Sequence, residues 1–145
     1  MKPLEGTTPN TPVETHDGGM ATLAELVDRP MLVNFWASWC PPCVHELPSL
    51  KVLDAALKGH DMAVMLVGLD RKGRPFAEQF LADRGIEIPR RGYDKTGDLP
   101  RALGIKVMPT SYLVGTGGAL IGIIEGPLDW GQPDVIAAVN AALKP

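Results

Sequence analysis

The stretch Met31–Leu47, MLVNFWASWCPPCVHEL, decides the fold of this 145-residue chain. Its first part, Met31–Ala37, is a β-branched and aromatic run of the kind found in strands buried on both faces. Its second part opens the stretch Pro41–Lys58, in which apolar residues recur at a helical spacing of three and four. The sequence therefore predicts a buried strand that passes directly into a helix, with two cysteines where the two elements meet.

The rest of the chain continues this alternation of strands and helices. The expected elements, in order, are a helix over Ala21–Val27, a strand over Ala63–Leu69, a helix over Pro75–Arg84, a helical turn over Leu99–Leu103, a hairpin of Thr110–Val114 and Ala119–Ile124, and a helix over Pro133–Leu143. This order predicts an α/β fold with a central mixed β-sheet flanked by helices on both faces. Residues 1–12, rich in Pro and Thr, are expected to be a flexible leader before a single domain, residues 13–145.

Composition excludes several classes of protein. The chain has 14 basic and 17 acidic residues, a net charge of −3, which offers no basic excess for nucleic acid. No apolar run approaches the ~20 residues that cross a bilayer. The first residues contain one Lys and no apolar segment, so no signal peptide or other targeting segment is expected. A monomer without a cofactor or metal is the expectation.

The two cysteines, Cys40 and Cys43, carry the chemistry. A disulfide between them would close a very small loop and stabilise the fold weakly, so the pair suits a bond that is made and broken. If Cys40 is the N-cap, Pro41 and Pro42 occupy the first two helical positions, where an N–H is not needed. The helix N-terminus then favours the thiolate of Cys40, the expected exposed nucleophile, and Cys43 lies inward as the resolving thiol.

Other uses of two cysteines are weaker. A structural zinc site needs four ligands, and only three scattered histidines, His16, His45 and His60, could complete it. A haem c attachment needs His directly after the second cysteine, where this chain has Val44. Two inert buried thiols would not explain the adjacent prolines and Trp39.

The segments VNFWASWCPPCVHELPSL, residues 33–50, and GIKVMPTSYLV, residues 104–114, together resemble the thioredoxin superfamily. More narrowly, they are similar to the membrane-anchored periplasmic thiol–disulfide oxidoreductases of the TlpA and ResA type. The similarity extends from about Gly18 to Gly126. It implies a thioredoxin-like fold, a redox-active Cys40–Cys43 disulfide, and a cis peptide bond before Pro109.

The resemblance also implies where a substrate binds. The backbone of Met108 would pair with an extended stretch of the partner protein, opposite the cysteines. The residues expected to contact substrate are therefore Trp39, Pro41, Pro42, Met108 and Pro109. Within the cysteine helix, the family's kink proline is matched by Pro48, which cannot donate to the carbonyl of Val44.

One departure from thioredoxin concerns the buried acid of its central strand, which is replaced here by Asn34. The TlpA-like pattern carries a glutamate three residues after the second cysteine, and Glu46 matches it. Glu46 would share a helix face with Cys43 and could relay the proton of the resolving thiol as a further catalytic residue. The alternative is an ordinary solvated glutamate, and Asn34 is expected to be a satisfied polar group of the strand.

The expected function is thiol–disulfide oxidoreduction by Cys40 and Cys43. The resemblance implies a reductase for disulfide-containing proteins in the periplasm, fed by a membrane-embedded electron donor and serving cytochrome or copper-centre assembly. Two alternatives stay open: a copper or zinc carrier using the same thiols, and a thiol peroxidase. The peroxidase setting places Thr three residues before the nucleophile, where this chain has Ala37.

Three further features have structural expectations. Trp36 should pack beneath the cysteine turn, and Trp130 should anchor the last loop to the sheet. The pair Arg90-Arg91 is expected to lie in a solvated loop.

Overall fold

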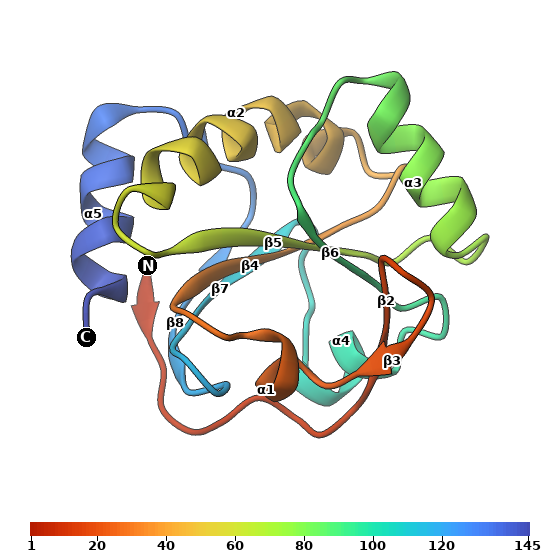
Figure 1. Ribbon diagram of the computed structural model, residues 1–145, viewed down its shortest axis with the longest axis horizontal. Coiled ribbons are helices and arrows are strands. Elements are labelled where there is room, and N and C mark those ends of the chain that lie inside the picture. The colour runs from red at the N-terminus through yellow and green to blue at the C-terminus, as the bar shows by residue number, and fades with distance from the viewer.

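The strand that precedes the cysteines lies at the centre of an eight-stranded sheet in the computed structural model, which describes residues 1–145 (Figure 1). The strands are β1 (Lys2–Pro3), β2 (Val13–Thr15), β3 (Met20–Ala21), β4 (Met31–Trp36), β5 (Ala63–Gly68), β6 (Arg90–Tyr93), β7 (Thr110–Val114) and β8 (Leu120–Glu125). The helices are α1 (Leu23–Leu26), α2 (Pro41–Lys58), α3 (Arg74–Asp83), α4 (Asp98–Leu103) and α5 (Pro133–Leu143).

The sheet is mixed, in the order β1-β8-β7-β4-β5-β6-β2-β3. The neighbours β4, β5 and β6 run parallel, whereas β7 runs antiparallel to β4 and forms a hairpin with β8. Parallel neighbours need crossover connections, and α2 and α3 supply them. The carboxyl end of β4 therefore meets the amino end of β7, because Phe35 pairs with Thr110.

Helices cover both faces of the sheet, as predicted, and β4 contributes alternate side chains to each face (Figure 1). Leu32 and Trp36 belong to the core beneath α2, α3 and α5, whereas Val33 and Phe35 belong to the core beside α1 and α4. Both sets are fully buried, and each such apolar side chain stabilises the fold by about 1.5–3 kcal/mol. This burial on two sides explains why β4 lacks an alternating polar pattern.

The structure differs from the sequence prediction at β6, which was expected to be a loop around Arg90-Arg91. Both arginines lie in the strand and are only partly exposed. The Arg91 guanidinium lies 2.7 Å from the carboxylate of Glu78 on α3, which also accepts from the Tyr93 hydroxyl. The expectation of a solvated loop is therefore wrong. Because the stems of charged side chains can be buried while their charged ends reach a partner, the hydropathy pattern of β6 does not indicate a strand.

Residues 1–12 also differ from the expected flexible leader. β1 pairs antiparallel with β8, and Thr7 forms an isolated bridge with Ala119. Thr8 is buried and donates its N–H to the Gly118 carbonyl at 2.8 Å. A side chain at Gly118 would collide with the Thr8 hydroxyl, so glycine permits this approach. Pairing through main-chain groups at a sheet edge needs no apolar side chains, which is why composition did not indicate it.

No helix combines the length and the apolar composition that a bilayer crossing requires.

Candidate active site

The turn between β4 and α2 has the local structure that its sequence predicts. Cys40 is the N-cap of α2 in extended conformation, and its Sγ accepts the backbone N–H of Cys43 at 3.3 Å. Pro41 and Pro42 occupy the first positions of the helix. The sulfur of Cys40 therefore lies at the positive end of the helix dipole, which stabilises a thiolate.

Cys40 and Cys43 form a disulfide, with their Cα atoms 5.3 Å apart. Cys43 is fully buried, and Cys40 retains an exposed fraction of only 5%. Cys40 is therefore much less exposed than the sequence predicted, although it is the more accessible of the two cysteines. Trp36 packs in the same core as both cysteines, as expected.

The second predicted segment lies beside this turn. The Met108–Pro109 peptide bond is cis, and Pro109 immediately precedes β7, whose first residue pairs with Phe35 of β4. Pro109 is buried and its carbonyl accepts the N–H of Gly126 at 2.9 Å. The backbone N–H and carbonyl of Met108 have no hydrogen-bond partner in the protein. They are free to pair with an extended peptide.

The predicted substrate-contacting side chains surround the disulfide unequally. Trp39 is 65% exposed, and Pro41 and Pro42 are exposed at the start of α2. Met108 is partly buried because it packs against both cores. The accessible surface is therefore wider on the side of Trp39.

Glu46 is buried, which excludes the solvated glutamate considered from the sequence. Its Oε1 accepts from Asn34 Nδ2 at 2.8 Å, and its Oε2 accepts from the Leu128 backbone N–H at 3.0 Å and from Trp130 Nε1 at 3.1 Å. Burial raises the pKa of the Glu46 carboxyl, and the three donors oppose that rise only in part. The Glu46 carboxyl therefore holds its proton to a higher pH than an exposed glutamate does.

Asn34 links this carboxyl to the neighbouring strand. Its Nδ2 also donates to the Ser111 hydroxyl at 2.9 Å, whereas its Oδ1 is buried without a partner. If the amide turned over, Oδ1 could accept a hydrogen bond from a protonated Glu46 or from Ser111. Asn34 is therefore a hydrogen-bond partner of the Glu46 carboxyl. Only the nitrogen of its amide is satisfied, which differs from the expectation of a fully satisfied polar group.

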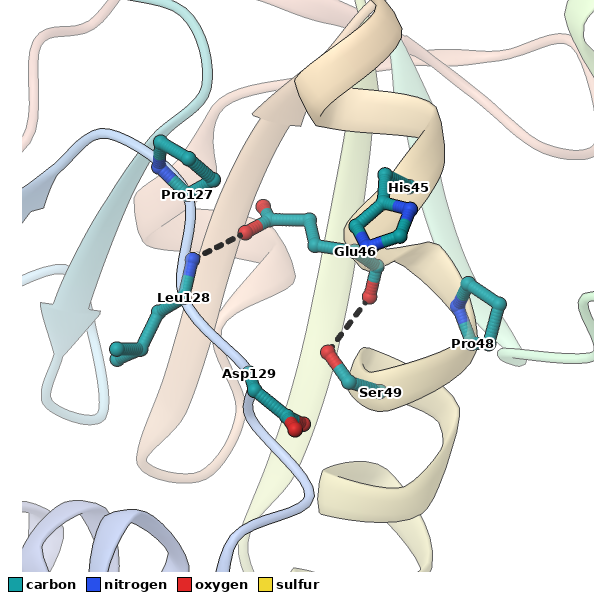
Figure 2. A pocket seen from close by; sticks show the side chains of 7 residues that line it. All are labelled: His45, Glu46, Pro48, Ser49, Pro127, Leu128 and Asp129. Carbon is teal, nitrogen blue, oxygen red and sulfur yellow. Dashed lines mark hydrogen bonds between the residues drawn. The ribbon is translucent and has the colours of Figure 1, made fainter.

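The loop after β8 encloses the other side of Glu46. A cavity of about 390 Å³ lies between α2 and this loop, with His45, Ser49, Pro127 and Asp129 in its wall (Figure 2). Figure 2 shows the Glu46 side chain crossing from α2 to the N–H of Leu128.

Trp130 was expected to anchor this loop to the sheet. It anchors the loop to α2 instead. Its indole N–H donates to Glu46, and its backbone N–H donates to the Ser49 hydroxyl at 3.1 Å.

We expect Trp130→Phe to lower the free energy of unfolding by about 2–4 kcal/mol, because a buried carboxylate loses a donor and the smaller ring leaves space. Urea unfolding at neutral pH measures this loss. Trp39→Phe is the control, since Trp39 is exposed and its replacement should change stability by less than about 0.5 kcal/mol. Equal losses for the two variants would contradict the role given to the Trp130 indole.

Sequence reasoning missed Asp70, which follows β5 and is buried. Its carboxylate accepts the backbone N–H of Ser38 at 3.1 Å and also the Ser38 hydroxyl. The cysteine turn is thus tied to the loop between β5 and α3. The available signal was an acidic residue at the carboxyl end of a strand parallel to β4, because such ends share one edge of the sheet.

No group of three or more His, Cys, Asp or Glu side chains in the chain is placed to hold a metal ion. The metal-carrier alternative would thus have to rely on two thiols that are joined in a disulfide here.

Comparison with curated proteins finds relatives with the same chemistry in their names. The chain is 30% identical over 115 residues to the thiol-disulfide oxidoreductase ResA of Oceanobacillus iheyensis, covering 79% of this chain and 59% of that protein. It is 33% identical over 129 residues to the thiol:disulfide interchange protein HelX of Rhodobacter capsulatus, covering 88% and 64%. The chain therefore spans about three fifths of the length of these relatives.

Solved structures give a similar result. A Chlorobium tepidum protein assigned as the thiol:disulfide interchange protein DsbE shares 28% identity with a TM-score of 0.79 over 99% of both chains. A second Chlorobium tepidum structure, a thiol:disulfide interchange protein of the thioredoxin family, shares 27% identity with a TM-score of 0.72, covering 97% and 98%.

The Redoxin family model matches residues 5–141, nearly the whole chain. Together with the N-capping Cys40, the cis bond before Pro109 and the relatives above, this match identifies the chain as a member of the Redoxin family, a thioredoxin-superfamily protein of the TlpA and ResA type.

Proposed function

We propose that this protein is a thiol–disulfide oxidoreductase that reduces disulfides in partner proteins. The observation that carries the proposal is the Cys40–Cys43 disulfide at the N-terminus of α2, next to the free backbone groups of Met108. The N–H and carbonyl of Met108 can hold the partner in an extended form, which gives affinity with little sequence selectivity.

The reaction proceeds in two exchanges. The Cys40 thiolate attacks one sulfur of the partner disulfide, forming a mixed disulfide and releasing the other sulfur as a thiol. The Cys43 thiolate then attacks Cys40, so the partner leaves with both sulfurs reduced and the protein holds the disulfide. Glu46 is proposed to take the proton of Cys43 in this second exchange, because it is a buried carboxyl on the same helix, three residues further on.

We also propose a cellular role, which the relatives support. We infer that the full-length protein is membrane-anchored in the periplasm, where a membrane-embedded donor returns electrons to the disulfide. The partners in this proposal are proteins of cytochrome or copper-centre assembly. The names of the relatives support the chemistry of interchange, and the resemblance to the TlpA and ResA type supports the compartment.

The reduction potential tests this proposal directly, because it separates a reductant from an oxidant. Equilibration with defined mixtures of reduced and oxidised dithiothreitol should give a potential nearer the value of about −270 mV for thioredoxin than about −180 mV for protein disulfide isomerase. The fraction reduced can be counted by alkylation and mass spectrometry. A potential at or above the second value would instead indicate an oxidase or isomerase.

A further inference from the structure

The surface next to the disulfide is hollowed on the side of Trp39. A cavity of about 520 Å³ lies there between the cysteine turn and the loop that joins β5 to α3, and it is lined by Trp39, Leu69, Arg71, Lys72 and Phe76. We call it the Trp39 cavity. Trp39 and Phe76 are among the few large apolar side chains that remain exposed in this protein, so the cavity combines apolar walls with charge.

The charge of the Trp39 cavity is positive at its surface. Arg71 and Lys72 are exposed, and neither has a carboxylate within ion-pairing distance. The ammonium of Lys72 lies 4.7 Å from the centroid of the Phe76 ring, which it can leave for a stronger anionic partner. The one carboxylate in the wall, Asp70, is buried and bonded to Ser38, so the exposed charge is that of the two cations.

A third cation without an ion pair lies close along the chain to the backbone that is expected to hold the partner. Lys106 is exposed two residues before Met108 and has no carboxylate within ion-pairing distance. The chain as a whole carries a net charge of −3. The exposed charge of the Trp39 cavity is therefore opposite in sign to that of the whole molecule, a distribution that steers an anionic partner toward this surface.

We propose that the Trp39 cavity receives an acidic segment of the partner protein that flanks its reactive cysteine and carries an aromatic or large aliphatic side chain. This inference rests on the proposed function and specifies its partner. The partner's carboxylates pair with Arg71 and Lys72, and its apolar side chain packs between Trp39 and Phe76. The backbone next to the partner's cysteine remains free to pair with Met108.

The test uses three peptides of equal length, each with one cysteine joined by a disulfide to thionitrobenzoate. One peptide carries glutamates and a phenylalanine, one carries lysines and a phenylalanine, and one carries serines. The reduced protein reduces this disulfide and becomes oxidised to the Cys40–Cys43 disulfide, which releases a peptide thiol and coloured thionitrobenzoate. The absorbance of thionitrobenzoate therefore gives the rate for each peptide. At low salt we expect the acidic peptide to react about 10-fold faster than the basic one. At about 1 M salt, where the Debye length is ~3 Å, the ratio should approach one.

The double variant Arg71→Glu/Lys72→Glu should invert the ratio of acidic to basic rates. Lys58→Glu/Lys144→Glu makes the same change in charge at the far ends of α2 and α5, and should preserve the ratio and the rate of the serine peptide. Thermal melting of all variants checks that each is folded. A ratio near one in the unmodified protein, or an unchanged ratio in the Arg71/Lys72 variant, would overturn the proposal.

A separate binding measurement distinguishes this proposal from the proposed function. The acidic peptide with serine in place of cysteine is titrated into the oxidised protein while tryptophan emission is followed, and saturable binding that the Arg71/Lys72 variant lacks supports the docking surface. Failure of the protein to cleave any of the three peptides would overturn the proposed function. Cleavage without preference, together with no binding of the serine analogue, would overturn only the docking surface.

Discussion

Replacing Cys40 by serine should reduce disulfide reductase activity to the uncatalysed background, whereas Cys43→Ser should leave a protein that traps its partners. Cys40 is the N-cap of α2 and the more accessible sulfur, and Cys43 is fully buried one turn inward. Without Cys43, the mixed disulfide on Cys40 has no internal thiol to resolve it. Incubation of each variant with a disulfide-bonded protein, followed by non-reducing electrophoresis, should show a stoichiometric adduct for Cys43→Ser alone.

The order of reactivity can be measured without a partner. Under native conditions, iodoacetamide should label Cys40 of the reduced protein at least about 10-fold faster than Cys43, because only Cys40 combines access with the helix N-terminus. Unfolding in urea is the control, since it should equalise the two rates. Faster native labelling of Cys43, or adducts on the Cys40→Ser variant, would reverse the two roles.

Glu46→Gln should slow the disulfide exchange by about 100-fold, in the range that general acid–base groups contribute, and should remove one ionisation from the pH–rate profile. The pKa of Glu46 is raised by burial, so the carboxyl retains its proton to higher pH than an exposed glutamate does. Stopped-flow measurement of the reduced protein against a small disulfide across a range of pH gives both quantities. An unchanged profile for the variant would exclude Glu46 from proton transfer.

Glu46→Gln should also change how the free energy of unfolding depends on pH. An ion-paired acid adds stability as pH rises, whereas Glu46 should lose it. Because the native state binds the proton more tightly than the unfolded state, the Glu46 contribution falls as pH rises from about 4.3, the unfolded value, through the raised native pKa. Glu46→Gln lacks this loss. Its free energy of unfolding should therefore rise relative to that of the unmodified protein across this interval, as urea unfolding at several pH values would show.

A second variant separates proton transfer from packing. The glutamine amide can mimic the protonated acid: its oxygen can accept from Leu128 and Trp130, and its NH₂, in the place of Oε1, can donate to Asn34 Oδ1 once the Asn34 amide turns over. Glu46→Leu leaves all of these donors without an acceptor, and each buried unpaired group costs about 1–3 kcal/mol. We expect Leu to be destabilising at every pH and Gln to be tolerated. Equal destabilisation by both would indicate a purely structural carboxyl.

The amino-acid sequence alone was sufficient to predict the local structure around the two cysteines and much of the fold. The limits of α2, β7 and α5 agree with the prediction, as does the position of Cys40 as N-cap. These features depend on interactions within a few residues: apolar periodicity, prolines at a helix start and a sulfur facing the N–H three residues ahead. Such interactions leave a direct pattern along the chain.

Only the tertiary structure decided the surroundings of the site. Glu46 has its partners 12, 82 and 84 residues away, on β4 and in the loop after β8, so no local pattern distinguishes it from a solvated helix residue. Arg71 and Lys72 border Trp39 because β5 lies parallel to β4 and ends at the same edge. The strand order brings these groups together, and the burial and charge of a side chain depend on neighbours that are distant along the chain.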